Sequence, residues 1–318
     1  MSAPTAARSG LPGAVATSGR PSPATTAALE AAALDPERVL AVVRMALEED
    51  LALGPDVTTE SVVPADARAV ADVVSRAAGV VAGLPVAAAV LEVAGRGAVT
   101  VTAAARDGDR VAPGDVLLTA EGPVRVLLTA ERTMLNLLGR LCGVATTTRT
   151  WVDAVAGTGA TIRDTRKTTP GLRALEKYAV RCGGGVNHRF GLGDEALVKD
   201  NHVAAAGGVA AALAAVRERA PHVPVEVECD TVAQVREAVA AGATLVLLDN
   251  MDLVATREAV AVARAAGGVR LEASGGLTLD RARAVAETGV DHVAVGALTH
   301  SAPVLDVGFD LRETRPGE

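Results

Sequence analysis

Hydrophobic positions along the chain follow two different rhythms, one before and one after a long helical stretch. Between residues 67 and 121, short valine-rich runs are broken by glycine and proline, with a helical pattern over 85–93. Beyond about residue 158, apolar runs of strand length recur, and most are separated by alanine-rich segments of helical spacing. Because strands that alternate with helices form parallel sheets, the second part is predicted to be α/β with a parallel sheet. The first part is predicted to be a small α/β domain with an antiparallel sheet.

The expected strands are short and well separated. In the first part they cover 70–74, 79–82, 99–103 and 116–120, and in the second part they cover 161–162, 196–198, 223–227, 245–248, 269–273 and 292–295. A βαβ unit takes roughly 30 residues, so the second part is too short for the eight repeats of a full barrel. We therefore expect an incomplete (β/α) barrel, preceded by a smaller N-terminal α/β sandwich domain.

The remaining segments set the predicted domain limits. Residues 1–34 carry few large apolar side chains, so they are predicted to be disordered, and removal of residues 1–30 is expected to preserve folding and activity. Asp35 and Pro36 mark the start of a helix, and residues 124–156 are predicted to form two helices that are broken near Gly143. The predicted division is a disordered extension, an N-terminal α/β domain, a barrel-like catalytic domain and a C-terminal segment, at 1–34, 35–145, 146–300 and 301–318 respectively.

Composition excludes several classes of function. The formal net charge is −7, which disfavours nucleic-acid binding. No apolar run approaches the ~18 residues of a membrane span, and the N-terminus lacks the apolar core of a signal peptide. The three cysteines match no zinc or redox spacing, and an odd number fits a reducing compartment. We therefore expect a cytoplasmic protein that binds neither nucleic acid nor membrane.

Basic residues are concentrated between residues 163 and 199, although the chain as a whole is acidic. Within this region, 165–171 has the position of a loop between a strand and a helix, and 183–189 places three glycines before His188 and Arg189. Arginine binds carboxylates and phosphates with two hydrogen bonds, so the expected partner is an anionic small molecule. A solvated helix face is the alternative explanation for three of the basic residues, Arg173, Lys177 and Arg181.

Carboxylates follow in the next two predicted strands. Glu226 and Glu228 alternate with valines, so both lie on one side of their strand, and Asp249 ends the apolar run that comes after. Carboxylates at neighbouring strand ends suit ribose hydroxyls or a magnesium ion. For Asp249 alone, capping of the following helix is the alternative.

Glycine-containing turns close the last two predicted strands, at 274–276 and 295–297. Glycine lets backbone N–H groups approach a ligand closely, and the loops after the last strands of a barrel commonly bind phosphate. These turns are therefore predicted to hold a phosphate group.

Eight motifs, taken in order, resemble those of the quinolinate phosphoribosyltransferase family. They are 48–51 with 56–59, 131–136, 165–172, 183–189, 197–202, 225–228, 248–251 and 273–276. The resemblance spans residues 36–310, and Cys142 departs from the family's frequent serine without touching any assigned residue. It implies that the chain joins quinolinate to phosphoribosyl pyrophosphate, with loss of CO2 and pyrophosphate, and so makes nicotinic acid mononucleotide for NAD biosynthesis. It also implies a homodimer, or a higher oligomer, in which the partner's N-terminal domain completes each active site.

The resemblance also implies roles for individual residues. Lys167, Glu228 and Asp249 form the catalytic group, and the last two hold the ribose and a magnesium ion bound with phosphoribosyl pyrophosphate. Quinolinate is bound by Thr165, Arg166, His188, Arg189 and Lys199, together with Arg132 of the partner subunit. The 5-phosphate is bound by Ser274, Gly275, Gly276, Val295, Gly296, Ala297 and His300.

Three alternatives remain open at the level of the sequence. A related type II phosphoribosyltransferase acting on another pyridine or pyrimidine-like base would need fewer groups for a second carboxylate. A Schiff-base aldolase on a barrel would use Lys167 or Lys199 as its nucleophile. A binding protein without catalytic activity would not need so many charged residues at strand ends.

Overall fold

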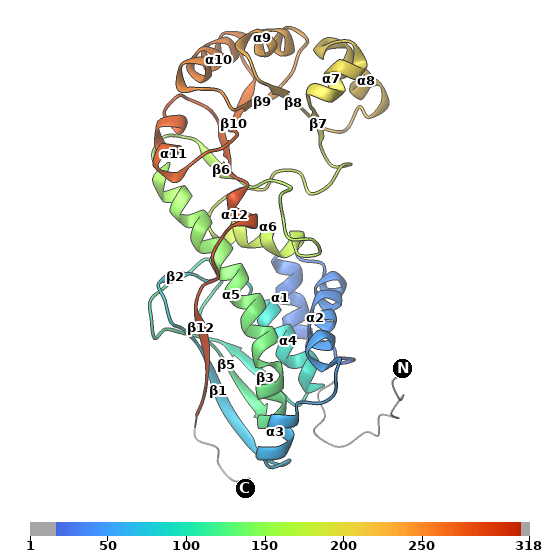
Figure 1. Cartoon of the computed structure of the whole chain (residues 1–318), viewed down its shortest axis with the longest axis vertical. Coiled ribbons are helices and arrows are strands. Elements are labelled where there is room, and N and C mark those ends of the chain that lie inside the picture. The colour runs from blue at the N-terminus through green and yellow to red at the C-terminus, as the bar shows by residue number, and fades with distance from the viewer. Residues whose placement is uncertain (1–16, 313–318) are drawn as a thin grey trace. The chain divides into compact units, whose positions relative to one another are not determined.

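The computed structural model describes residues 17–312, which form two compact units (Figure 1). Unit 1 contains the residues up to Gly143 together with those from Val304 onward, and unit 2 contains Val144–Pro303. The division falls inside one continuous helix, α5 (Val124–Ala154). The predicted break near Gly143 is wrong, because a glycine within a helix costs only about 1 kcal/mol relative to alanine and a long helix can absorb that cost.

Unit 1 is built on a four-stranded antiparallel sheet with the order β12-β1-β5-β3. Its strands are β1 (Arg68–Ser75), β3 (Thr100–Ala103), β5 (Val116–Pro123) and β12 (Val307–Leu311). A second, two-stranded sheet pairs β2 (Gly79–Val80) with β4 (Arg110–Val111). The predicted antiparallel sheet is confirmed. The C-terminal residues 307–311 are not a separate segment, because they add an edge strand beside β1.

In the described part of the chain, unit 1 also contains four helices that precede α5. They are α1 (Pro23–Ala31), α2 (Pro36–Leu51), α3 (Val57–Val62) and α4 (Leu84–Gly95). The α4 helix is buried along almost its whole length, since it packs against α1, α2 and the strands β3 and β5. As predicted, Asp35 caps α2, accepting hydrogen bonds from the backbone N–H groups of Glu37 and Arg38.

The prediction of disorder over residues 1–34 is wrong for the helix α1. Ser22 caps this helix and Pro23 begins it, while Leu29 is fully buried. The hydroxyl groups of Ser22 and Thr25 both donate to Glu92 Oε1 on α4, at 3.0 and 2.9 Å. One apolar anchor and one buried carboxylate are therefore enough to order a segment of mostly small residues. The rest of the predicted extension, residues 1–16, lies outside the described residues.

Unit 2 contains a six-stranded parallel sheet with the order β6-β11-β10-β9-β8-β7. The strands are β6 (Thr161–Arg163), β7 (Ala196–Val198), β8 (Val225–Cys229), β9 (Leu245–Asp249), β10 (Arg270–Ser274) and β11 (His292–Ala294). The first strand, β6, pairs with the last, β11, as in a barrel, whereas β6 and β7 are the two edges of the sheet. The incomplete (β/α) barrel is therefore confirmed, and all six predicted strands are present within a few residues.

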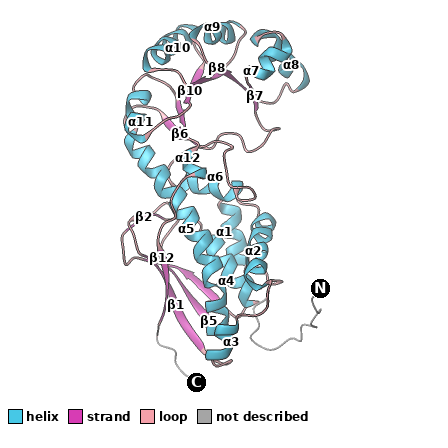
Figure 2. Ribbon diagram, viewed as in Figure 1, coloured by secondary structure: helices cyan, strands magenta, loops and turns pink. Residues whose placement is uncertain are grey.

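Helices lie along the outer side of this curved sheet (Figure 2). The helices of unit 2 that follow α5 are α6 (Arg173–Cys182), α7 (Asp200–Ala206), α8 (Val209–Arg219), α9 (Val232–Ala240), α10 (Leu253–Ala266), α11 (Leu279–Ala286) and α12 (Ala297–His300). One face of the sheet is apolar, with Val227, Val246 and Leu271 fully buried, as expected for strands under helices, whereas the other face carries charged residues such as Glu226 and Glu272. Within residues 17–312, no helix is both long and apolar enough to cross a membrane.

Candidate active site

A cavity of about 400 Å³ opens at the carboxyl ends of the parallel strands of unit 2. Barrel enzymes place their chemistry at this end, because the loops that follow the strands converge there. Eleven of the residues predicted from the sequence line the cavity: Thr165, Arg166, Lys167, His188, Arg189, Lys199, Glu228, Asp249, Ser274, Gly275 and Gly276. The fold therefore brings together residues that are more than 100 positions apart in the chain.

The other predicted residues lie beside this cavity or in unit 1. Val295, Gly296, Ala297 and His300 follow β11, and a Cβ atom added at Gly296 would come within 3.0 Å of Lys167 Cδ and 3.2 Å of His300 Nε2. Arg132 belongs to unit 1, where it is exposed on α5 in a hollow lined also by Asn136 and residues 304–307.

Positive charge dominates the cavity. Arg166, Lys167, Arg189 and Lys199 line it from three different loops, against the carboxylates of Glu228 and Asp249 among others. Burial, and after it the Arg166 guanidinium, lowers the pKa of Arg189, so the two arginines are close enough to repel each other. Cations held together in this way favour a ligand with several negative charges.

Lys199 and Glu228 form an ion pair across one side of the cavity. Lys199 is half exposed and Glu228 is mostly buried, so the pair sits at the boundary between the cavity and the protein. Asp249 is held differently, because Asn250 Nδ2 donates to Asp249 Oδ2 at 2.8 Å.

The turns after β9 and β10 pack tightly against each other. The Asn250 backbone N–H donates to the carbonyl of Ser274 at 3.0 Å, and both Asn250 and Gly275 have positive φ, of 53° and 95°. A Cβ atom at Gly275 would lie 2.3 Å from Asn250 Oδ1, so only glycine fits there. The missing side chain lets the turn pack against Asn250 at the wall of the cavity.

A group of buried charged residues lies under the cavity. Arg163 Nη1 is 2.6 Å from Glu272 Oε2 and 3.9 Å from Glu226 Oε1, and Arg163 Nη2 is 3.3 Å from Glu195 Oε2. Burial raises the pKa values of Glu226 and Glu272 to about 7. We call Arg163, Glu195, Glu226, Glu272 and His188 the floor cluster.

The floor cluster contains residues that the sequence pattern did not single out. Glu226 was grouped with Glu228, and both do lie on one side of β8, but Glu226 is fully buried whereas Glu228 borders the cavity. Glu195 and Glu272 were not recognised at all. For Glu272 a signal existed, since it is the one charge inside the apolar run Leu271–Ser274. A charge within a buried strand is costly unless it has a partner.

His188 has both ring nitrogens bonded within the protein. Its Nε2 lies 2.8 Å from Glu226 Oε2, and its Nδ1 accepts from the Arg189 backbone N–H at 2.7 Å. Because Nδ1 accepts, the proton of the neutral ring is on Nε2 and is donated to Glu226. Neither nitrogen is free for the carboxylate contact that the resemblance implies, so His188 positions Arg189 in this structure.

The alternative explanation of a solvated helix face is wrong for Lys177. Lys177 and Asp164 have no exposed side-chain surface and form an ion pair. Lys177 Nζ also donates to the carbonyl of His188 at 2.9 Å, and Asp164 Oδ1 accepts from the His188 backbone N–H at 2.8 Å. The pair therefore holds both polar groups of the His188 main chain.

The remaining two basic residues of α6 are partly buried. Arg173 Nη1 donates to the carbonyl of Phe190 at 2.8 Å, and Arg181 Nη1 donates to Asn187 Oδ1 at 3.0 Å. Most of the helix face that was predicted to be solvated thus supports the loop that carries His188 and Arg189.

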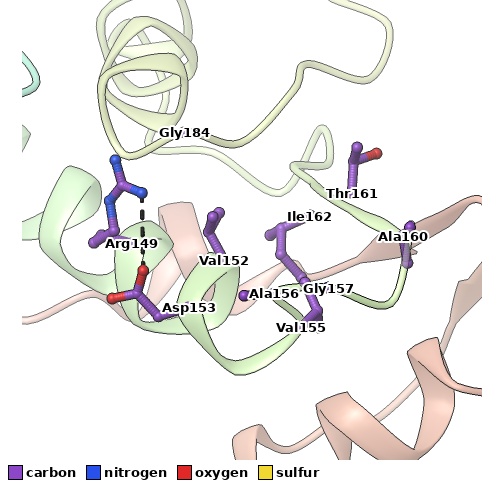
Figure 3. Close-up of a pocket in the computed structure, with 11 residues that line it drawn as sticks. Arg149, Val152, Asp153, Val155, Ala156, Gly157, Ala160, Thr161, Ile162 and Gly184 are labelled. Carbon is purple, nitrogen blue, oxygen red and sulfur yellow. Dashed lines mark ion pairs between the residues drawn. The ribbon is translucent and has the colours of Figure 1, made fainter.

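Two other features of unit 2 resemble binding sites. His188, Glu226 and Glu272 lie close enough together for a metal ion, but Arg163 already supplies the positive charge there. A second hollow of about 510 Å³ lies at the amino end of β6, where Arg149 faces Asp153 at 3.8 Å (Figure 3). Its walls are largely small and apolar, and it lies away from the end of the barrel that carries the chemistry.

An incomplete (β/α) barrel with several cations, two carboxylates and a glycine turn around one cavity defines an enzyme that acts on highly charged anionic small molecules. The family description "Quinolinate phosphoribosyl transferase, C-terminal domain" matches residues 144–310, and the corresponding N-terminal domain matches residues 56–142. The chain therefore belongs to the quinolinate phosphoribosyltransferase family. It is a pentosyltransferase of NAD biosynthesis.

Individual relatives agree with this assignment. The chain is 55% identical over 273 residues to the carboxylating nicotinate-nucleotide pyrophosphorylase of Mycobacterium leprae. The aligned region covers 85% of this chain and 95% of that relative. The chain is 36% identical to the decarboxylating quinolinate phosphoribosyltransferase 1b of Nicotiana tabacum, covering 85% and 81%. The structure of nicotinate-nucleotide pyrophosphorylase from Francisella tularensis superposes with a TM-score of 0.81 at 35% identity, covering 87% of this chain and 96% of that one.

Proposed function

We propose that the cavity of unit 2 transfers the phosphoribosyl group of phosphoribosyl pyrophosphate to quinolinate and then releases CO2. The observation that carries this proposal is the convergence of four cations with Glu228 and Asp249 in one cavity. Quinolinate is a dianion and phosphoribosyl pyrophosphate carries more charge still, so a site for both must be strongly cationic. The carboxylates of Glu228 and Asp249 bind the ribose, which lies between the phosphate groups and the base.

The two carboxylates of quinolinate bind to Arg166, Arg189 and Lys199, with Thr165 beside them. These side chains come from separate loops, which suits two anionic groups at a fixed separation. Lys167 lines the cavity next to the turn at Gly296, which supports its assignment to the reacting centre beside the phosphate turn. Nicotinate has only one carboxylate and would leave part of this cationic set unpaired.

Phosphoribosyl pyrophosphate occupies the rest of the cavity. Glu228 and Asp249 hold the ribose hydroxyls, and the turns 274–276 and 295–297, with His300, hold the 5-phosphate. The same two carboxylates fit a magnesium ion, because hard oxygen donors are its preferred ligands. When bound, magnesium neutralises charge on the departing pyrophosphate. Lys199 must then release Glu228 and turn to a quinolinate carboxylate.

The reaction proceeds at C1 of the ribose, where the pyridine nitrogen replaces pyrophosphate. Positive charge develops on the sugar as the bond to pyrophosphate weakens, and the carboxylates of Glu228 and Asp249 stabilise that charge. The alkylated nitrogen is then positive. It stabilises the electron pair that remains on the ring when the adjacent carboxylate leaves as CO2, and a proton takes its place.

We further propose a homodimer in which Arg132 contributes to the partner's cavity, because every other cation assigned to quinolinate belongs to unit 2. Arg132 is exposed on its own unit. A cytoplasmic location is supported by the three cysteines, whose odd number and wide spacing fit a reducing compartment.

A product assay tests the proposed function. The purified chain, given quinolinate, phosphoribosyl pyrophosphate and magnesium, should release CO2 and pyrophosphate in equal amounts. Chelation of the metal should stop both, and fresh magnesium should restore them. Pyrophosphate release with nicotinate but not with quinolinate would instead identify a phosphoribosyltransferase for another base, and no release with either would contradict the proposal.

A further inference from the structure

The floor cluster contains more buried negative charge than positive charge. Glu195, Glu226 and Glu272 contribute three carboxyl groups, and Arg163 is the one guanidinium among them. His188 adds no charge, because its Nδ1 accepts a hydrogen bond from the Arg189 backbone. With all three carboxyl groups ionised, the cluster would carry two net negative charges of its own in a largely buried position. Such a group binds a proton instead.

Glu272 is the member best placed to carry that proton. Glu272 and Glu226 both lack exposed side-chain surface, and the Oε1 atom of each has no hydrogen-bond partner among the described residues, but Glu272 alone of the two lines the cavity. Glu272 contributes to this wall from β10. Burial, and next the charge of Glu226, raises the pKa of Glu272 to about 7, which makes its protonation sensitive near neutral pH.

The charges that face Glu272 come from all the elements packed around it. Arg163 lies on β6, Glu226 and Glu228 lie on β8, and His292 lies opposite on β11. His188, Arg189 and Glu195 belong to the loop before β7, and Lys177 lies behind His188 on α6. Burial lowers the pKa values of His188 and His292, so both favour the neutral form.

We propose that Glu272 is a neutral carboxylic acid whenever the dianionic substrate occupies the cavity, so that quinolinate binds together with a proton. This inference rests on the proposed function, since it needs a dianion directly above the floor cluster. A dianion raises the cost of a nearby carboxylate and leaves the cost of a carboxylic acid almost unchanged. Glu272 does not touch the reacting atoms in this scheme. It sets the electrostatic potential under them.

The direction of the pH dependence follows from linkage. Below about pH 7, Glu272 is already protonated and quinolinate binding requires no proton from solution. Above that pH the empty site has lost the proton, and it must be recovered on binding. Quinolinate affinity should therefore fall as pH rises, with a limiting slope of roughly tenfold per pH unit.

Calorimetric titration with quinolinate tests this in two buffers of different ionisation enthalpy. At pH 7, quinolinate binding to the wild type should be accompanied by the uptake of about half a proton per site, because Glu272 in the empty site is then about half protonated. From about pH 6.5 to 8.5 the dissociation constant of the wild type should rise about 25-fold, as a pKa of about 7 in the empty site requires. Glu272→Gln keeps the shape of the neutral acid, so its affinity should match the wild type at the acid end, stay nearly constant, and exceed the wild type at the alkaline end.

Glu258→Gln is the matched control, because Glu258 is an exposed glutamate on α10 that pairs only with Arg236 in the described structure. It should behave as the wild type does. A structural role for Glu272 would weaken binding at every pH, so tighter binding of Glu272→Gln in alkali separates the two explanations.

Two results would overturn the inference while leaving the proposed function intact. One is quinolinate binding by the wild type without proton uptake and without pH dependence. The other is unchanged proton uptake in Glu272→Gln, which would place the proton on another group such as His188. A wild type that binds no quinolinate at any of these pH values would contradict the proposed function, and the inference with it.

Discussion

Lys177 and Asp164 are fully buried, and burial works against the charge on each of them. It lowers the pKa of Lys177 and raises the pKa of Asp164, although each charge attracts the other. The pair is nevertheless well satisfied, because Lys177 also donates to the His188 carbonyl and Asp164 accepts from both Asn187 and the His188 backbone. Its structural role is to fix the main chain that presents Arg189.

At the residue scale we therefore expect Lys177→Met to be strongly destabilising. It leaves Asp164 as an uncompensated buried charge, which costs about 3–5 kcal/mol. Arg236→Met is the comparison, since Arg236 forms an exposed ion pair with Glu258 that is worth about 1 kcal/mol or less. Urea unfolding should show a much lower midpoint for Lys177→Met only. Equal midpoints for the two variants would mean that the buried pair is not needed for stability.

The helix α1 shows how little apolar surface a short element needs when it docks on a formed core. Its N-terminal signal, Ser22 followed by Pro23, is the same kind as the Asp35–Pro36 signal that correctly predicted α2. The surrounding residues are mostly small, and this composition led to a prediction of disorder despite the capping signal. What orders α1 is its contact with α4, through Leu29 and the hydrogen bonds to Glu92.

At the element scale, Leu29→Ala should destabilise the protein by about 2–5 kcal/mol, as is usual for a buried leucine in a core. Leu53→Ala is the matched control, because Leu53 is 103% exposed and Leu29 is 0% exposed. Thermal unfolding should show a lower Tm for Leu29→Ala and almost no change for Leu53→Ala. If both variants unfold like the wild type, α1 does not contribute to the core and the original expectation that residues 1–30 are dispensable stands.

At the scale of the whole molecule, the dimer proposal makes a prediction about mixtures. Arg132→Ala damages a residue of unit 1, and Lys167→Ala damages a residue of the cavity in unit 2. If Arg132 serves the partner, a mixed dimer contains one site with both changes and one site with neither. Random pairing makes about half of the dimers mixed, so mixing two inactive proteins should restore roughly a quarter of wild-type activity.

The mixing must be done under conditions that exchange subunits, and exchange is verified with differently tagged chains. The control is a mixture of Lys167→Ala with Arg166→Ala, two changes in the same unit, which should restore no activity. Activity that stays at the level of the parents despite verified exchange would show that Arg132 acts within its own chain, or that the sites are not shared.

The local sequence pattern was sufficient to predict the barrel strands and many of the cavity-lining residues. Short apolar runs separated by segments of helical spacing predicted all six strands of the barrel, because strands packed under helices are rich in buried apolar residues. The residues near the ends of those runs, together with the resemblance to the quinolinate phosphoribosyltransferase family, identified eleven lining residues, since a barrel directs all its strand ends to one side. Both features depend on residues that are neighbours in the chain.

Only the tertiary structure decided which charges are buried and what they contact. Lys177 looked like any lysine on a polar helix face, and Glu272 like a single irregularity in a strand, until packing enclosed the first with Asp164 and the second with Arg163. Tertiary contacts also decided that α1 forms a helix, that α5 is continuous and that β12 pairs with β1. The reason is physical: the cost of a buried charge and the gain from a docked helix depend on partners distant in sequence, which no local pattern records.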